Sequence, residues 1–412
     1  MSQTTFSPVK PSERYVILDA LRGFALLGIC LANYPEFSLY TFQPADVAAS
    51  MPSAIVDRIV RFLQYVFIDG KFYTLFSLLF GMGFSIIISH AEQKGDGAFR
   101  LFYRRMTVLL VIGFLHLMFI WSGDILMLYA LMGMVLPLFR NVSNRKMLSW
   151  AAFFLVLPVV VDTLTQIFGI SLSAPAVEAQ WHYCRKYGIT EENFAYWLRD
   201  ADSYAQVFQF LIQGALVRVQ EFVDGNRYFK VLGLFLIGYY IGRQKMYADP
   251  SAHRHLLRRV SVIGFSVGLP LSVVYAWSAV GGHPFGNAAH SLLYAVSVYP
   301  LGFAYMSSLC LLYLLSSRSS VWRALAAPGR MALTNYICQS IAGMFLFYGI
   351  GFGLGAGVGL SLTEIIALAV FVLQMLLSLL WLHYCLFGPL EWIWRMLNYG
   401  KPLQLFKQKQ RG

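Results

Sequence analysis

Ten mainly apolar stretches recur along the chain, separated mostly by short polar connections. A helix needs about 20 apolar residues to cross a hydrocarbon core of roughly 30 Å, and its backbone groups must be satisfied within the segment. The sequence therefore predicts an all-α integral membrane protein with about ten transmembrane helices, at 16–38, 71–91, 104–121, 124–140, 147–170, 229–245, 258–280, 288–316, 331–353 and 362–387.

The composition agrees with this class of protein. Of the 412 residues, 58% are hydrophobic and 13% are charged, whereas soluble domains average about 45–50% and 25%. The net charge of +12 lies in short clusters between apolar stretches, so we expect membrane lipids as partners and no nucleic acid. The first thirteen residues are polar, and the apolar stretch after them is long enough to be retained as a span.

The basic residues predict the orientation. If the N-terminus is cytoplasmic, 23 of the 32 Lys and Arg fall in cytoplasmic segments. Because cytoplasmic loops are enriched in Lys and Arg, ten spans in this orientation place both termini in the cytoplasm.

Three segments outside the spans have distinctive patterns of apolar, aromatic or basic residues. Residues 51–68 have an apolar stripe at helical spacing and predict an amphipathic helix in the outer interface. Residues 171–228 are polar and aromatic and predict two or three short helices, which form either an interfacial cap or a substrate lid. The basic tail contains Trp392 and Trp394, which favour an anchor at the inner leaflet.

We divide the chain accordingly into four parts: an N-terminal transmembrane half (1–170), an outer cap segment (171–228), a C-terminal transmembrane half (229–387) and a basic tail (388–412).

His116 and Asp124 lie eight residues apart in an apolar hairpin, GFLHLMFIWSGDILMLYALMG. Ionisable groups inside a membrane are costly and usually face an internal cavity. A carboxylate that accepts from one imidazole nitrogen leaves the other nitrogen free as a general base. The pair is therefore either an acid–base pair or a structural tie within the hairpin.

Further polar groups lie at the ends or on one face of other spans. Arg22, three residues after Asp19, either forms a local ion pair or binds a phosphate or carboxylate. Arg104 and Arg105 are either a topology signal or a polyphosphate site on the helix of His116.

Asn33, at the outer end of the first span, either meets a substrate or bonds another helix. Asn335 and Gln339 share a helix face and either line a cavity or join helices. The five cysteines show no metal-ligand spacing, and we expect no metal site.

Several of these motifs together resemble one family. DALRGFALLGICLANYPEF, GKFYTLFSLLFGMGF, GFLHLMFIWSGDILMLYALMG, GRMALTNYICQS and FGPLEWIWRMLNYGK resemble the YeiB-like family of bacterial multispanning proteins, over nearly the whole chain. Part of that family is classed as a domain of unknown function. The resemblance implies the bacterial cytoplasmic (inner) membrane as the location.

That family is similar to the transmembrane acyltransferase superfamily, whose members move an acyl group from cytosolic acyl-CoA to an acceptor beyond the membrane. The resemblance implies a transmembrane acyltransferase-like bundle, an acyl-CoA such as acetyl-CoA as donor, and a small-molecule or glycan acceptor. His116 and Asp124 match the His and Asp of the family's GFLHxxxxWxGDIL motif, and Arg22 matches the Arg of its LRG motif. Acyltransferase-three proteins carry a His near the outer end of the first span, where this chain has Asn33.

Under this hypothesis His116 deprotonates the acceptor, and Asp124 orients the His116 ring. Asn33 or Trp121 stabilises the oxyanion, and Arg22, Arg104 and Arg105 hold CoA phosphates. Asn335 and Gln339 are candidate substrate-binding residues. Two other functions stay open: a transporter or flippase of lipids or small molecules, and a non-catalytic scaffold or homo-oligomer packed through small residues.

Overall fold

The structure is a computed structural model that describes residues 15–92 and 98–407. These residues form helices joined by turns, and their only strand-like pairing is a β-bridge between Cys385 and Phe406. Five of the basic residues counted for the orientation lie outside the described residues: Lys10, Arg14, Lys94, Lys409 and Arg411.

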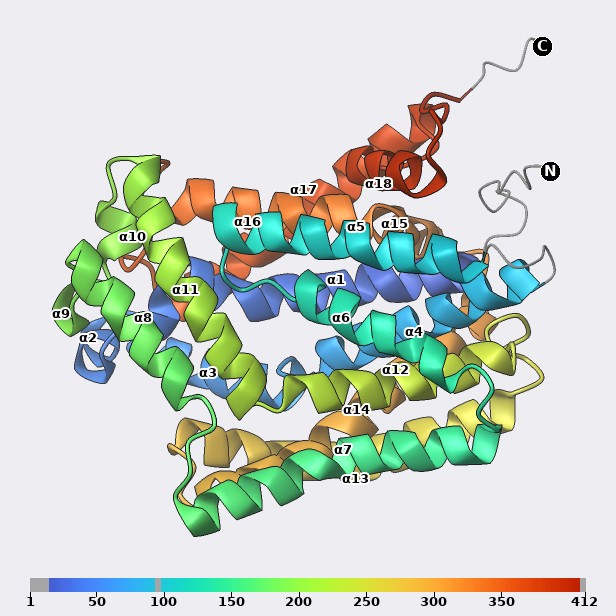
Figure 1. The fold of residues 1–412 in the computed structure, drawn as a ribbon, viewed down its shortest axis with the longest axis horizontal. Coiled ribbons are helices and arrows are strands. Elements are labelled where there is room, and N and C mark those ends of the chain that lie inside the picture. Colours follow the sequence, from blue (N-terminus) through green and yellow to red (C-terminus); the bar gives the residue numbers. More distant parts are fainter. Residues whose placement is uncertain (1–14, 93–97, 408–412) are drawn as a thin grey trace.

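Seven helical stretches of the described residues are long and apolar enough to cross a membrane, which confirms a multi-pass membrane protein. Figure 1 shows the long helices lying side by side along one axis. The seven stretches are α1 (Val16–Phe37), α3 with α4 (Ala54–Phe67 and Lys71–Glu92), α5 (Ala98–Phe119), α7 (Asn144–Phe168), α13 (Arg254–Val280), α14 (Gly286–Ser316) and α17 (Leu360–Tyr384).

Three shorter helices lie where the remaining three spans are predicted. They are α6 (Leu126–Val135), which continues as a 3-10 turn (Leu136–Phe139), α12 (Arg227–Arg243) and α16 (Ala332–Phe347). Every predicted span therefore coincides with a helix to within a few residues, apart from longer differences at the start of α5 and the end of α16. The short helices lie among longer ones, and α12 packs on both α4 and α7.

The outer surface of the bundle is apolar. Large apolar side chains are exposed along α5, α7, α13 and α17, for example Phe114, Phe153, Ile263 and Ile365. A soluble protein rarely exposes contiguous apolar surface of this extent. These faces are suited to lipid, whereas many polar side chains of the spans, such as His116, Asn335 and Ser378, are buried between helices.

The two ends of the bundle differ. One end, which we call the basic end, holds the starts of α1, α5, α7 and α13 and carries Arg104, Arg145 and Arg258. The opposite end, the cap end, holds the short α2 (Ala45–Ser50) and the cap segment (Figure 1). The predicted two or three helices of the cap segment are four: α8 (Ala174–Tyr187), α9 (Glu191–Phe194), α10 (Trp197–Asp200) and α11 (Tyr204–Asp224). The capping box of Thr190 and Asn193 starts the additional short helix α9.

The amphipathic helix predicted at 51–68 exists as α3, but Asp57 and Gln64 on its polar side are buried, whereas Arg58 is exposed. Asp57 is fully buried and accepts hydrogen bonds from the Ser361 backbone N–H (2.8 Å) and hydroxyl (2.7 Å) at the start of α17. Gln64 bonds Glu364 of the same helix. On the apolar stripe, Ile55 and Ile59 are 70% and 56% exposed, whereas Val66 is buried. Buried polar and exposed apolar side chains in the first part of α3 are the reverse of a soluble helix and are favourable where lipid is the solvent.

The predicted tail anchor contains α18 (Pro389–Tyr399), which is tied to the bundle. Its buried Glu391 accepts hydrogen bonds from the backbone N–H groups of Leu333 (2.7 Å) and Thr334 (3.1 Å). These donors belong to the first turn of α16, where such groups have no intrahelical partner. The α18 helix thus fixes where α16 begins, beside α15 (Ser320–Arg330).

Glycine lets α4 and α12 approach closely. A β-carbon on Gly81 would overlap the carbonyl oxygen of Phe235, and one on Gly238 would overlap that of Leu78. Gly83, two residues further along α4, has no atom within 4 Å of the corresponding position. Small residues at helix contacts are typical of membrane bundles.

We predict that Gly81→Ala destabilises the protein by about 1–3 kcal/mol, because the methyl group forces α4 and α12 apart. Gly83→Ala, with the same gain in helix propensity, should be neutral or stabilising by up to about 1 kcal/mol. Thermal unfolding of the purified variants in detergent measures both. Equal changes in the unfolding temperature of the two variants would show that the close contact between α4 and α12 contributes nothing to stability.

Candidate functional site

His116 and Asp124 are brought together in the interior. His116 Nδ1 lies 2.9 Å from Asp124 Oδ1, and each residue is only 1% exposed. Asp124 Oδ2 also accepts a hydrogen bond from the Met127 backbone N–H (2.8 Å) at the start of α6. The carboxylate thus holds the ring and caps a helix with its second oxygen.

The second nitrogen of the imidazole has a partner as well. His116 Nε2 lies 2.9 Å from the hydroxyl of Ser340, 224 residues further along the chain, on α16. Ser340 is 1% exposed. Asp124, His116 and Ser340 therefore form a continuous hydrogen-bonded chain, which we call the buried triad. Its order of carboxylate, imidazole and hydroxyl is that of acyl-transfer sites on several unrelated folds.

A cavity of about 760 Å³ lies at the cap end, next to the buried triad. Its walls come from the end of α1, the start of α4, the 121–126 loop, the end of α7, the α11–α12 junction and the α13–α14 region. This volume is in the range of small-molecule sites. The walls carry charged side chains of both signs: Glu36, Asp69, Asp162, Arg218, Glu221, Asp224, Arg227 and Lys230.

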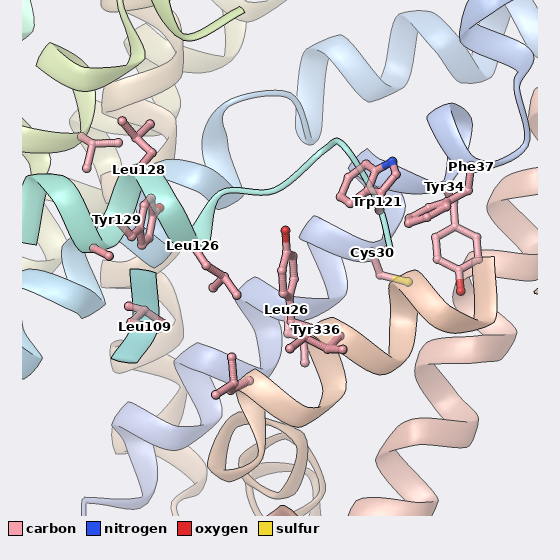
Figure 2. Close-up of a cluster of buried hydrophobic side chains, with 14 of the residues drawn as sticks. Leu26, Cys30, Tyr34, Phe37, Leu109, Trp121, Leu126, Leu128, Tyr129 and Tyr336 are labelled. Atoms are coloured by element: carbon pink, nitrogen blue, oxygen red, sulfur yellow. The ribbon is translucent and has the colours of Figure 1, made fainter. Parts of the chain in front are cut away.

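One aromatic side chain and one loop separate the buried triad from the cavity. Tyr336 lines the cavity, and its ring centre lies 5.1 Å from that of His116. Figure 2 shows the Tyr336 hydroxyl pointing toward the loop that joins Trp121 to Leu126. Gly123 and Ile125 of this loop also line the cavity. The triad is therefore directly behind the cavity wall rather than on its surface.

Arg218 of the cap segment fixes that loop. Its Nε–H donates to the Ser122 carbonyl (2.9 Å), and its guanidinium pairs with Glu221. The guanidinium carbon also lies 5.9 Å from the centre of the Trp121 ring. Burial opposes ionisation of Glu221, but Arg218 and Arg227 outweigh it and lower the pKa of this carboxyl below its ordinary value.

In another part of the cavity wall, a lysine lies against a tyrosine ring. Lys230 Nζ lies 4.0 Å from the centre of the Tyr294 ring, a cation–π distance. Tyr275 donates a hydrogen bond to Asp69 (2.5 Å). Asp162 accepts one from the Asn226 side chain (2.7 Å). The cavity thus offers both signs of charge to a polar ligand.

Two predicted site residues lie near this arrangement. Asn33 lines the cavity at the end of α1. Trp121 is buried, with its ring centre 6.2 Å from that of His116 and 4.5 Å from that of Phe37. Their roles in stabilising an oxyanion stay predictions.

Asn335 and Gln339 lie elsewhere on α16. The Asn335 side chain donates to Ser378 (2.9 Å), and the Gln339 side chain donates to Gln374 (3.0 Å), both on α17. Neither belongs to the cavity wall. In this arrangement the two amides join helices, and a contact with substrate stays a prediction.

The three predicted phosphate-binding arginines lie at the basic end. Arg22 donates to Asp19 (2.9 Å) and is close enough to Arg105 for their charges to interact. The Arg105 guanidinium lies over the Trp394 ring of α18, 4.9 Å from its centre. Arg104 is exposed. None of the three reaches the cavity wall, which belongs to the other end.

Sequence reasoning missed Ser340, Tyr336 and Arg218. Ser340 and Tyr336 lie in the motif GRMALTNYICQS, of which only the amide stripe was singled out. Tyr336 and Ser340 are four residues apart and share a helix face. Arg218 was counted only as an outer basic residue, and no sequence signal connects it with Ser122.

We predict that Arg218→Gln lowers the free energy of unfolding by about 1.5–3 kcal/mol, because a charge-assisted hydrogen bond to Ser122 is lost. Arg199→Gln is the matched control, since Arg199 lies over the Tyr196 ring and its only ion pair among the described residues is with the adjacent exposed Asp200, and such pairs contribute about 0–1 kcal/mol. Thermal unfolding in detergent measures both variants. If the two variants unfold alike, Arg218 does not hold the 121–126 loop.

Comparisons with known proteins place the chain in a family. A family model described as "Protein of unknown function (DUF418)" matches residues 241–401. The chain is 30% identical to the uncharacterized protein YxaH of Bacillus subtilis, over 96% of this chain and 97% of that protein. It is 29% identical to an uncharacterized 39.9 kDa protein from the amylase 3′ region of Bacillus acidopullulyticus, over 98% and 99%.

The uncharacterized protein YeiB of Escherichia coli is 28% identical, over 94% of this chain and 96% of that protein. The matched DUF418 region contributes Ser340 and Tyr336, whereas His116 and Asp124 come from the N-terminal half. The near-complete coverage on both sides confirms the resemblance found in the motifs. The chain belongs to the YeiB-like family of DUF418 membrane proteins.

Proposed function

We propose that this protein is a membrane acyltransferase of the bacterial inner membrane, which moves an acyl group from cytosolic acyl-CoA to a polar acceptor at the cap end. The observation that carries the proposal is the buried triad, placed directly behind the wall of a charged cavity. The combination of a held imidazole and an adjacent polar cavity supports acyl transfer over a purely structural tie.

The proposed roles of His116 and Asp124 follow from the direction of the hydrogen bond between them. An ionised Asp124 can only accept, so the proton of neutral His116 lies on Nδ1 and the lone pair on Nε2. Nε2 is then the atom that takes a proton during acyl transfer. The Asp124 carboxylate stabilises the imidazolium that results and holds the ring in place.

The cavity is the proposed acceptor site. Its volume fits a small molecule or the end of a glycan, and its tyrosines offer hydroxyl groups and flat faces to such a ligand. Carboxylates and cations in the same wall favour a polar or charged acceptor over an apolar one. The acceptor reaches the triad when Tyr336 or the 121–126 loop moves.

The basic end is the proposed donor side. Positive residues mark the cytoplasmic face of membrane proteins, so this orientation places Arg22, Arg104 and Arg105 in the cytoplasm. Arg104 is exposed and Arg22 is partly exposed, so both are able to take phosphate oxygens from a CoA. Bound acyl-CoA would supply the activated acyl group.

Transport is a second candidate, favoured by one observation: the charged cavity lies within a bundle of spanning helices. Intramembrane charges often mark substrate pathways. A transporter would exchange a radiolabelled polar solute across liposomes without acyl-CoA, and an acyltransferase would not. We place acyl transfer first because transport does not require a triad.

We predict that the purified protein in liposomes transfers the acyl group of radiolabelled acyl-CoA to a member of a panel of amino sugars, sugars and polar amines. His116→Gln should lower the rate at least about 100-fold, because the general base is lost. Asp124→Asn should lower it by up to about 10⁴-fold, because the imidazole takes the wrong tautomer.

His383→Gln is the matched control, since His383 is exposed on α17. It should transfer at the wild-type rate. Thermal unfolding of each variant separates loss of chemistry from loss of fold. Transfer by a folded His116→Gln protein at the wild-type rate would refute the proposed role of the triad.

A further inference from the structure

We propose that Ser340 carries the acyl group during transfer as a serine ester. This inference rests on the proposed function and goes beyond it, since general-base catalysis by His116 does not require a covalent intermediate. The contact that supports it is the 2.9 Å distance between Ser340 Oγ and His116 Nε2.

The direction of the hydrogen bonds supports a nucleophile. With the proton on Nδ1, held by Asp124, Nε2 is an acceptor and the Ser340 hydroxyl is the donor. A base that receives the hydroxyl proton activates the oxygen for attack on a carbonyl. The contact of Ser340 Oγ with its own helix, at the Tyr336 carbonyl, is longer, at 3.4 Å.

Other serines in the spans bond differently. The hydroxyls of Ser89, Ser297 and Ser316 donate to the carbonyl four residues earlier, at 2.6–2.9 Å. That is the ordinary way for a helical serine to satisfy its hydroxyl in an apolar environment. The Ser340 hydroxyl also lies near the carbonyl four residues earlier, but it is closer to the imidazole of His116.

The position of Ser340 suits a relay between two substrates. It is the ninth of sixteen residues in α16, so it lies about 12 Å along the axis from the start of the helix at the basic end. One turn before it, Tyr336 lines the cavity of the cap end. An acyl-serine at this place would let the donor leave before the acceptor reacts.

The reaction balances in two steps. Ser340 Oγ attacks the thioester carbonyl of acyl-CoA while His116 Nε2 takes the hydroxyl proton; the C–S bond breaks, and His116 returns this proton to the thiolate, which leaves as free thiol. In the second step His116 takes a proton from the acceptor hydroxyl or amine, which attacks the ester carbonyl. The C–O bond to Ser340 breaks, and the proton moves to Ser340 Oγ.

The experiment incubates the full-length purified protein with radiolabelled acetyl-CoA and, separately, longer acyl-CoA thioesters, without any acceptor. We expect label on the wild-type protein, on the peptide that contains Ser340, and its release by hydroxylamine. Ser340→Ala and His116→Gln should lose the label. In parallel, each protein is assayed for transfer with the acceptor panel.

Two variants control for folding. Ser378→Ala removes another buried hydroxyl, which is bonded to Asn335 rather than to the imidazole, and should keep the label. Ser340→Cys keeps a nucleophile of similar size, and its thioester should be cleaved by neutral hydroxylamine faster than the serine ester. Labelling of Ser340→Cys tests the inference even if Ser340→Ala fails to fold.

The outcomes separate the two proposals. If the wild-type protein transfers acyl groups and folded Ser340→Ala does so at the same rate, the acyl-serine is refuted and the proposed function stands. Label on a residue other than Ser340 refutes it as well. If the wild-type protein neither takes label nor transfers an acyl group to any acceptor, the proposed acyltransferase function is refuted, and the acyl-serine with it.

Discussion

One buried imidazole, held between a carboxylate and a hydroxyl, is the interaction around which this bundle is organised. His116 comes from α5, Asp124 from the loop before α6, and Ser340 from α16. In an interior without bulk water each of these groups is costly unless it is paired. Their mutual satisfaction therefore couples the N-terminal half of the chain to the DUF418 region.

Other buried carboxylates of the described residues have a different task. Asp57 accepts from the start of α17, and Glu391 accepts from the start of α16. Both helices begin with backbone donors that need partners, and a negative charge is favourable there. These two acids are explained by helix geometry. The charges of the cavity wall, such as Lys230 and Asp69, do not cap helices, and they are the ones that a ligand can use.

The positions of the polar groups along the bundle set the direction of the proposed acyl transfer. Arg22, Arg104 and Arg105 lie at the basic end, the charged cavity lies at the cap end, and the buried triad lies between them. Arg218 connects the cap segment to the loop beside the triad, through the Ser122 carbonyl. A ligand that moves the cap segment would therefore also move the wall that closes the triad from the cavity.

The sequence by itself determined the class of fold, the long apolar helices, and the His116–Asp124 pair of the candidate site. Apolar length sets each span, because a helix must match the bilayer, and the hairpin between His116 and Asp124 is local enough to bring them together. It did not determine the burial of Asp57 and Gln64 on α3, which depends on Ser361 and Glu364, some 300 residues away. The partner of His116 Nε2, the helix-joining role of Asn335 and the cavity were decided only by the tertiary structure. Hydrogen bonds between distant segments leave no periodic trace in a sequence, whereas burial in lipid does.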